Sequence, residues 1–217
     1  MPSISVENYL KVIYTLETRE GRAKNKRIAE ALEVRLPSVT SKLKSLAADG
    51  LVDYEPYKGA KLTSQGTALA LKVIRKHRLI EMFLVETLGF GWDEVHPEAE
   101  LLEHAVSDTV AARIEAFLDY PKTDPHGDPI PSAEGEIAFQ DAQPLSEFKP
   151  TSVVRVTRVL DQSPDVLRYL TEVGLTLTAV LEVDSVLPFD GQMTLKTGDE
   201  TLQISRILAS KLLVTRI

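Results

Sequence analysis

The 217-residue sequence contains no cysteine, which excludes disulfide bonds and metal sites built on thiolate ligands. It has no apolar run that approaches the length of a membrane-spanning helix, and its N-terminus lacks the charged-then-apolar pattern of a signal peptide. Histidine is scarce, with four in the whole chain. These absences favour a cytoplasmic protein, and any metal that it binds must be held by nitrogen and oxygen atoms.

What is present is the composition of an ordinary globular protein with an uneven distribution of charge. Hydrophobic residues make up 43% of the chain and charged residues 26%, which is enough to build a core. The net charge is −7, yet residues 1–64 hold 11 Lys and Arg against 8 Asp and Glu, while residues 65–135 hold 6 against 13. A basic first third on an acidic protein indicates a local surface for a polyanion, and the acidic middle would suit a cation.

Three of the four histidines lie beside carboxylates at helical spacing. His77 precedes Glu81 by four residues, and His96, Glu100 and His104 follow one another at the same interval. Residues four apart share one face of a helix, and imidazole nitrogen with carboxylate oxygen is a ligand set for Mn, Fe or Zn. The alternative is a pair of amphipathic helices with solvated charges, and the spacing alone leaves both interpretations open.

The first 64 residues have the pattern of a winged helix-turn-helix. Apolar residues at helical spacing predict a helix that begins at Ser3 or Ser5 and ends near residue 20, a second at about 24–32, and a third from Pro37 to Asp49. Two short strands, 51–54 and 61–63, follow with a turn between them and form the wing. The basic charge of this region agrees with binding to DNA.

The middle of the chain predicts three further helices. One is capped by Thr63 or Ser64 and runs to about residue 88, and another is opened by Pro97 and carries Glu100, Glu103 and His104. A third begins at Ser107-Asp108. These helices have more apolar surface than a small domain can hide alone, so we expect burial in a homodimer.

The remainder of the sequence changes character twice. Residues 120–150 are rich in proline, glycine and acids, which predicts a linker or ordered loop; His126 lies here and is not assigned as a ligand. Five β-type runs then follow with a helical insert at 164–173, and they predict a small barrel. The runs are 153–160, 176–183, 192–195, 202–204 and 212–217.

In this order the elements resemble the diphtheria-toxin-repressor/manganese-transport-regulator family of metal-activated transcriptional repressors. The matching segments are residues 7–14, 28–32, 75–81, 95–108 and 127–131, with Lys76-His77 to Glu81 and His96 to His104 as the most specific text. The resemblance implies a mainly α protein with a small β domain. We expect a winged helix-turn-helix at 1–64, a helical dimerisation and metal-binding domain at 65–135, a linker at 136–150 and an SH3-like β-barrel at 151–217.

The resemblance also implies two metal positions. An activating site would use Asn8, Glu100, Glu103 and His104, and an ancillary site would use His77, Glu81 and His96. Asn8 offers a neutral amide oxygen where manganese-responsive members have a carboxylate, so Glu7 or water remains an alternative, and Lys11 replaces the acid of members with paired metals.

Within this resemblance Glu100 indicates a manganese-responsive member, because iron-responsive members typically have cysteine at that position. Hard oxygen ligands favour Mn²⁺, with Fe²⁺ as the alternative, and Zn²⁺, Co²⁺ or Cd²⁺ could substitute in vitro.

The expected function is repression of metal-uptake genes by a homodimer that binds palindromic operator DNA when a divalent metal is bound. The predicted DNA-binding residues on the third helix, its entry and the wing are Arg35, Pro37, Ser38, Thr40, Ser41, Lys42, Lys58 and Lys61. Because most of these side chains are small and hydroxylated, we expect phosphate contacts and DNA shape to provide much of the affinity.

Two other functions compete with that of a metal-dependent repressor. A winged-helix regulator with an organic effector would leave the acids solvated, and metal analysis would distinguish it. A metallohydrolase is disfavoured because the sequence has no His-Glu-x-x-His order and no Gly-rich or nucleophile-elbow segment. We therefore expect no enzyme activity, no small organic substrate and no membrane partner.

Overall fold

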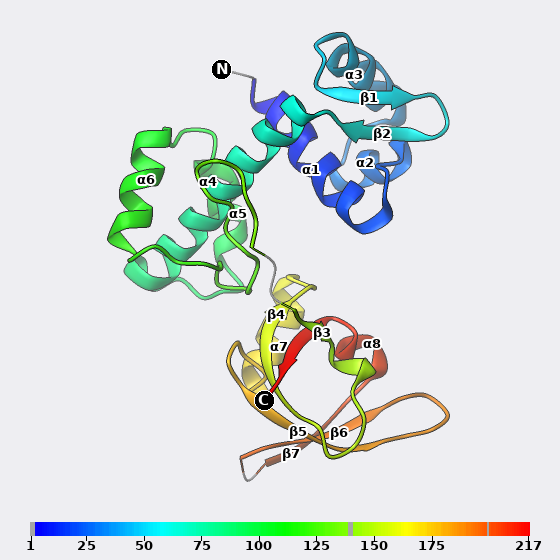
Figure 1. Ribbon diagram of the computed structural model, residues 1–217, viewed down its shortest axis with the longest axis vertical. Helices are drawn as coiled ribbons and strands as arrows, with labels where there is room; N and C mark the ends of the chain where they lie inside the picture. The colour runs from blue at the N-terminus through cyan, green and yellow to red at the C-terminus, as the bar shows by residue number, and fades with distance from the viewer. Residues whose placement is uncertain (1–2, 139–140, 199) are drawn as a thin grey trace. The chain divides into compact units, whose positions relative to one another are not determined.

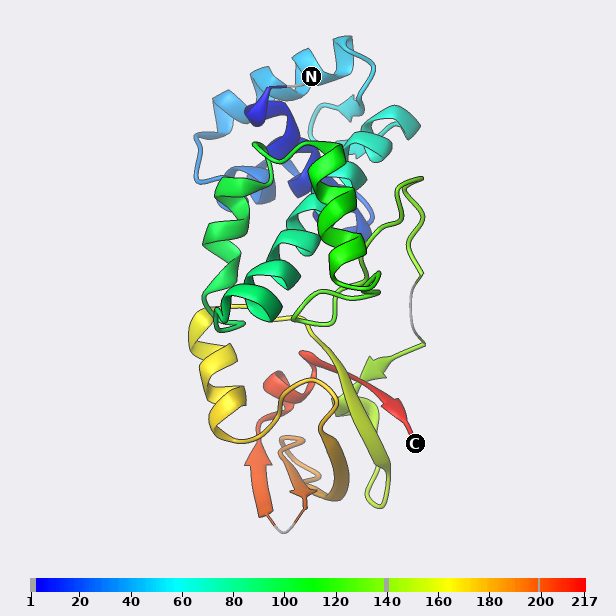
Figure 2. The same cartoon turned by 90° about the vertical axis from the view of Figure 1, so that its left-hand side faces the viewer.

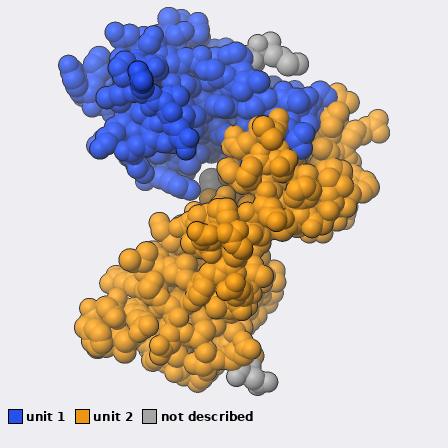
Figure 3. Space-filling model, turned by 180° about the vertical axis from the view of Figure 1, so that it is seen from behind, with its two compact units in different colours: residues 1–77, 102–108, 131–137 blue, residues 78–101, 109–130, 138–217 orange. Residues whose placement is uncertain are grey.

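The computed structural model describes residues 3–138, 141–198 and 200–217. They form two compact units, which Figure 3 shows in blue and orange. Unit 1 comprises residues 1–77, 102–108 and 131–137, and unit 2 comprises residues 78–101, 109–130 and 138–217. Both units are therefore assembled from segments that are far apart in the sequence.

The N-terminal part of unit 1 is a winged helix-turn-helix, which confirms the prediction. Its elements are α1 (Ile4–Glu20), α2 (Asn25–Ala31), α3 (Leu36–Ala48), β1 (Val52–Glu55) and β2 (Gly59–Leu62) (Figure 1). The three helices share one core, in which Leu10, Ile28 and Leu43 are fully buried. Helix α1 ends at Glu20, and the following Gly21 has the left-handed backbone (φ 76°) that is usual for a residue after a helix.

The two-stranded wing is fixed to the loop between α1 and α2. Its strands pair antiparallel, with Val52 opposite Leu62, and Ala23 of the loop forms a β-bridge with Ala60. Gly59 has a φ of 100°, and a Cβ atom at this position would collide with the carbonyl oxygen of Ala23. Glycine alone fits there, so the close approach holds the wing against the helix-turn-helix.

Three helices follow: α4 (Ser64–Leu88), α5 (Val95–Leu102) and α6 (Asp108–Phe117). The predicted cap of α4 is confirmed, because the Thr63 hydroxyl accepts a hydrogen bond from the Gly66 amide at 3.1 Å. Helix α4 supplies residues to both units, since the boundary between them falls after His77.

Helix α5 is shorter than the sequence predicted. It begins at Val95 and ends at Leu102, so Glu103 and His104 follow the helix instead of lying on it. The amides of Ala105 and Val106 both donate to the Leu102 carbonyl at 3.0 Å, and this tightened turn ends the helix. The two residues thereby leave the face that regular helical spacing would give them.

The C-terminal part of unit 2 is an antiparallel sheet with the strand order β3-β8-β4-β5-β6-β7 (Figures 1 and 2). Its elements are β3 (Gln143–Pro144), β4 (Val153–Val159), β5 (Val180–Val186), β6 (Met193–Thr197), β7 (Glu200–Ile204), β8 (Leu212–Arg216), the helices α7 (Pro164–Glu172) and α8 (Arg206–Ala209), and the 3-10 turn Leu145–Glu147. The five expected strands and the helical insert are all present. Inward residues such as Val154, Leu181 and Val214 are fully buried.

The sheet of the predicted SH3-like domain is open over the described part of the chain, so it does not close into a complete barrel. Strands β3 and β7 stand at its two ends, and no pairing joins them among the described residues. Strand β3 has two residues, and Pro144 has no amide hydrogen to donate to a further strand. An edge this short ends the sheet.

The helices of unit 2 and the segment that follows α6 expose large apolar side chains, as the dimer hypothesis requires. Phe117 is 68% exposed and Leu101 74%, and Leu88, Val110 and Tyr120 are exposed as well. Among the described residues, no helix combines the length and the apolar run that crossing a membrane demands.

Candidate metal centre and nucleic-acid interface

The first candidate centre lies in unit 1 around Glu103, which is 1% exposed. Its Oε2 atom lies 2.6 Å from His77 Nδ1, and its Oε1 atom lies 2.6 Å from the Lys11 ammonium. Burial raises the pKa of Glu103, but the hydrogen bond with His77 and the charges of Lys11 and His77 outweigh burial and leave this pKa below its usual value. The surroundings of Glu103 therefore favour its ionised form although the side chain is buried.

His104 joins this centre to the first helix. Its Nδ1 atom lies 2.6 Å from Glu7 Oε2, and its Nε2 atom lies 3.3 Å from Glu103 Oε1 without forming a hydrogen bond. Asn8 Oδ1 is also buried and has no hydrogen-bond partner among the described residues. Within the described part of the chain, two polar atoms of the predicted activating set are thus buried without a hydrogen-bond partner, which is costly unless a cation satisfies them.

The structure divides the predicted activating set between the two units. Asn8, Glu103 and His104 belong to unit 1, whereas Glu100 belongs to unit 2, where its Oε1 atom lies 3.6 Å from His96 Nε2. Glu7, which the sequence left as an alternative to Asn8, contacts His104 directly. Both residues of the first helix are therefore available to this centre.

The second candidate centre lies in unit 2 around Glu81, which is 1% exposed. The predicted partner His96 places its Nδ1 atom 3.3 Å from Glu81 Oε1. The other predicted partner, His77, stands one helical turn before Glu81 on α4.

Sequence reasoning missed two further residues of this second centre. His126 Nδ1 lies 4.0 Å from Glu81 Oε2 and 4.0 Å from Asp124 Oδ1, and all three residues are buried. Their ligand atoms lie within 4.8 Å of one another. The available signal was Asp124-Pro-His126-Gly-Asp128, a histidine flanked by acids in a turn.

The charges around Asp124 favour a cation there. Its Oδ1 atom accepts hydrogen bonds from the amides of His126 and Asp128, both at 2.9 Å, and Arg78 lies 3.5 Å from its Oδ2 atom. Burial raises the pKa of Asp124 well above its usual range, and the charges of Asp128 and Glu81 raise it further against the opposing effect of Arg78. A bound divalent cation would relieve this repulsion between buried acids.

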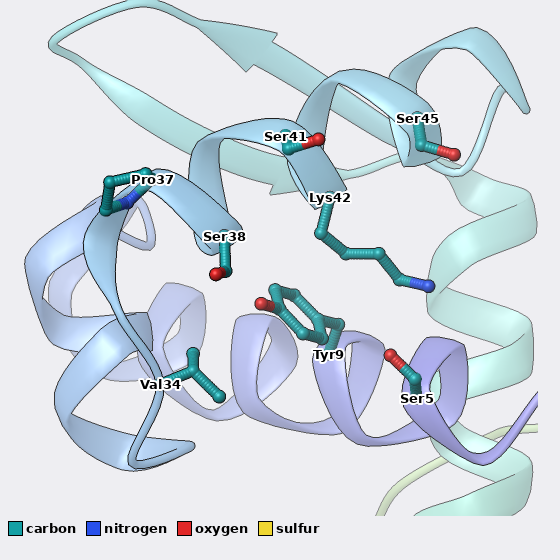
Figure 4. A pocket seen from close by; sticks show the side chains of 8 residues that line it. All are labelled: Ser5, Tyr9, Val34, Pro37, Ser38, Ser41, Lys42 and Ser45. Carbon is teal, nitrogen blue, oxygen red and sulfur yellow. The ribbon is translucent and has the colours of Figure 1, made fainter.

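The candidate nucleic-acid interface is the exposed face of α3. Arg35 stands at its N-cap, and Pro37, Ser38 and Ser41 are exposed. The last three line a hollow of about 710 Å³ together with Ser5, Tyr9, Val34, Lys42 and Ser45. Figure 4 shows the side chains that line it, on and beside α1 and α3. A concave, hydroxyl-rich surface of this kind suits contact with a phosphate backbone.

Two of the predicted DNA-binding residues on α3 also have partners within the protein. The Thr40 hydroxyl donates to the Leu36 carbonyl at 3.2 Å and accepts from Asn25 at 3.1 Å. The Lys42 ammonium lies 6.0 Å from the centre of the Tyr9 ring. Thr40 is therefore the less available of the two, because its hydroxyl is already used between α2 and α3.

The wing presents its lysines in different ways. The Lys58 ammonium is paired with Glu55 at 2.7 Å, and Arg22 pairs with the same carboxylate at 2.7 Å. Hydrogen bonds with Lys58 and Arg22 hold the pKa of Glu55 below its usual value. Lys61 is exposed on β2, so we expect it to meet phosphate more readily than Lys58.

Comparison with known protein families gives three matches in chain order. Residues 1–60 match "Iron dependent repressor, N-terminal DNA binding domain", residues 63–132 match "Iron dependent repressor, metal binding and dimerisation domain", and residues 143–216 match "FeoA domain". Together these matches cover nearly the whole chain.

Individual relatives agree with the family matches. The iron-dependent repressor IdeR of Mycobacterium leprae is 38% identical over 170 residues, which cover 77% of this chain and 72% of that protein. The diphtheria toxin repressor of Corynebacterium glutamicum is 31% identical over 224 residues, 98% of this chain and 96% of that one. Among solved structures, a manganese-dependent transcriptional repressor in complex with manganese is 37% identical, with a TM-score of 0.88 over 98% of this chain and 100% of that one.

Proposed function

The chain belongs to the family of metal-dependent transcriptional repressors that includes the diphtheria toxin repressor, IdeR and MntR, and on this premise we propose that it is a manganese-responsive member. Its relatives are repressors and not enzymes, in agreement with the prediction from sequence. In our proposal a homodimer binds palindromic operator DNA and represses metal-uptake genes when Mn²⁺ is bound. A regulator of this kind works where the genome is, in the cytoplasm.

The observation that carries the choice of metal is the chemistry of the buried ligands. The candidate centres offer carboxylate and amide oxygens and imidazole nitrogens, and the chain has no cysteine to add a soft ligand. Hard ligands of this type favour Mn²⁺ over metals that prefer sulfur. Fe²⁺ is the alternative, because relatives named for iron match as well as those named for manganese.

For the activating site we propose the ligands Asn8, Glu100, Glu103 and His104. Support comes from the buried atoms Asn8 Oδ1 and His104 Nε2, which have no hydrogen-bond partner among the described residues. A bound metal would supply the positive charge that the carboxylates need. In this proposal the role of the protein's own residues is to hold α1, through Glu7 and Asn8, against the segment that carries Glu103 and His104.

This attachment explains how metal occupancy would control DNA binding. Without the metal, the carboxylates of the proposed ligand set should disfavour one another's approach and loosen the hold on α1, although Lys11 already pairs with Glu103. With α1 held in place, the two heads of a dimer would present their α3 helices to successive major grooves of an operator. Metal and operator binding would then be coupled in both directions.

The domain organisation that we propose follows the same plan. We assign the DNA-binding domain to residues 1–64, the dimerisation and metal-binding domain to 65–135, the linker to 136–150 and the C-terminal domain to 151–217. The family matches at 1–60, 63–132 and 143–216 support this division.

We expect fluorescence anisotropy of a labelled operator to separate these possibilities. The protein is titrated onto a promoter fragment of a metal-transporter gene in chelator, in Mn²⁺ or in anaerobic Fe²⁺. Binding that appears with Mn²⁺ alone supports the proposal, and an equal response to Fe²⁺ would overturn the choice of manganese. Binding that is indifferent to chelator would contradict metal dependence altogether.

For the ancillary position we propose that Glu81 binds the metal together with Asp124 and His126. The predicted set of His77, Glu81 and His96 shares Glu81, so the two sets compete for one carboxylate. Burial supports the set of Glu81, Asp124 and His126, because His126 is 0% exposed whereas the His96 side chain is 51% exposed.

A pair of alanine variants distinguishes the two ligand sets. We expect His126→Ala to bind one Mn²⁺ fewer per chain in isothermal titration calorimetry, while His96→Ala keeps the stoichiometry and loses less than about tenfold in affinity. The two substitutions are chemically identical and differ in burial. The opposite result, with His96→Ala losing the ion, would restore the set predicted from sequence.

A further inference from the structure

Trp92, the single tryptophan of the chain, contacts the second candidate centre in two ways. It lies between α4 and α5, and its backbone carbonyl is 2.8 Å from His126 Nε2. Its indole ring stacks against the imidazole, with the ring centres 6.1 Å apart and the planes inclined by 17°. The backbone and the side chain of one residue thus both restrain His126.

The carbonyl contact determines which nitrogen of His126 carries the proton. A backbone carbonyl can only accept a hydrogen bond, so Nε2 must be the donor. In the neutral ring Nδ1 is then left with a bare lone pair. This atom is buried, has no hydrogen-bond partner among the described residues, and lies 4.0 Å from oxygens of both Glu81 and Asp124.

The indole is itself attached to the C-terminal part of unit 2. Its Nε1 atom donates to the Thr171 hydroxyl on α7 at 2.9 Å, and that hydroxyl donates to the Leu167 carbonyl at 3.0 Å. The next residue, Asp93, pairs with Arg168 on the same helix at 3.3 Å. The ring also packs against the core of the sheet domain, so Trp92 connects His126 to α7.

We propose that Trp92 is a positioning residue for the metal site of Glu81, Asp124 and His126. Its carbonyl fixes the tautomer that presents Nδ1 to the ion. Its indole, which is hydrogen-bonded to Thr171 on α7, holds the plane of the imidazole ring. This inference rests on the proposed function of that cluster. Trp92, Asp124 and Thr171 also line one hollow of about 480 Å³, so this side of the site borders an open space beside the indole.

Two variants remove the indole contacts while the backbone carbonyl stays in place. Trp92→Ala removes the ring, and we expect it to weaken Mn²⁺ binding at this site about 10- to 100-fold, the usual effect of losing a group that orients a ligand. Thr171→Val removes only the hydroxyl that anchors the ring, and we expect a smaller loss in the same direction. Glu172→Gln is the matched control on α7, because Glu172 is exposed and takes no part in the contacts that attach Trp92 and Asp93 to this helix; its Mn²⁺ affinity should equal that of the wild type.

Tryptophan fluorescence provides a readout that a purely structural role would not change. Because Trp92 is the only tryptophan, we expect its emission to change during a Mn²⁺ titration of the wild type and to stay constant in His126→Ala. Thr171→Val keeps the fluorophore, so its tryptophan emission during the Mn²⁺ titration should differ from that of the wild type even if Trp92→Ala folds poorly.

The outcomes separate this inference from the proposed function on which it rests. If His126→Ala loses no ion in calorimetry, the site itself is wrong and the inference fails with it. If His126→Ala loses the ion but Trp92→Ala and Thr171→Val bind Mn²⁺ like the wild type, the site stands and the inference alone is overturned. An emission change that persists in His126→Ala would also overturn it.

Discussion

Glu103→Gln is expected to lose the response of operator binding to Mn²⁺ while the protein remains folded. Glutamine keeps the shape of the side chain and can still pair with His77 and Lys11, but it removes the charge that a divalent ion requires. The coupling between metal and operator is typically 1–3 kcal/mol, so operator affinity in Mn²⁺ should fall about 5- to 150-fold, to the metal-free level. Anisotropy of a labelled operator measures this directly.

The matched control for this variant is Glu98→Gln on α5. Glu98 is exposed and is not among the proposed ligands, so the same change of charge there should leave the Mn²⁺ response intact. Circular dichroism and thermal melting of both variants establish that they are folded. If Mn²⁺ still raises the operator affinity of the Glu103→Gln protein, Glu103 is not a metal ligand.

The helical part of the fold could be predicted closely because its signals are local. The stripe of Tyr9, Leu10, Ile13 and Leu16 and the cap at Thr63 each depend on neighbours within two helical turns. Candidate ligands on α4 and α5 followed from the same spacing. The end of α5 could not be predicted this way, because a tightened turn at Leu102 leaves the apolar pattern unchanged.

The second metal centre escaped prediction for a different reason. Asp124 and His126 lie in a turn with no periodic pattern, and their place depends on contacts with residues about 30 positions later. The His126 carbonyl accepts from the Val159 amide at 2.9 Å, and Asp128 is bonded by Gln162 at 2.8 Å and by Arg158. Pairings at this separation carry no local sequence signal.

Sheet closure escaped prediction on similar grounds. Alternating apolar residues located the strands β4 to β8 but say nothing about whether the two outer strands meet. The short β3 with its proline decides that, and two residues are too few to be recognised as a strand from sequence. In the same way, helical spacing assigned Thr40 to the DNA face without revealing its bond to Asn25.

Gly127 is the residue of the second centre whose replacement should have the largest effect on stability. It lies between His126 and Asp128 with a φ of 86°, a conformation that side chains with a Cβ rarely adopt. A Cβ atom there would collide with the carbonyl oxygen of Thr157 and would lie 2.7 Å from Arg158 Cα, both on β4. Because these are backbone atoms of a strand that is paired with β5 and β8, they cannot move aside cheaply.

Gly127→Ala is therefore expected to destabilise the protein by about 3 kcal/mol or more, since backbone strain and overpacking each cost roughly 1–3 kcal/mol. Urea denaturation followed by circular dichroism measures this loss. The matched control is Gly89→Ala, where φ is 73° but a Cβ would meet no atom within 4 Å among the described residues. It should cost only about 1 kcal/mol, the contribution of strain alone.

The same substitution tests whether the turn delivers His126 to the metal. To escape β4 the turn must shift, and the bond between the His126 carbonyl and the Val159 amide must lengthen or break. We expect Gly127→Ala, at temperatures where it is still folded, to bind one Mn²⁺ fewer per chain in calorimetry, whereas Gly89→Ala keeps the wild-type stoichiometry. Equal losses of unfolding free energy in Gly127→Ala and Gly89→Ala would mean that β4 does not restrict this turn. A destabilised Gly127→Ala that keeps every ion would mean that the ligands of this centre are positioned without the turn.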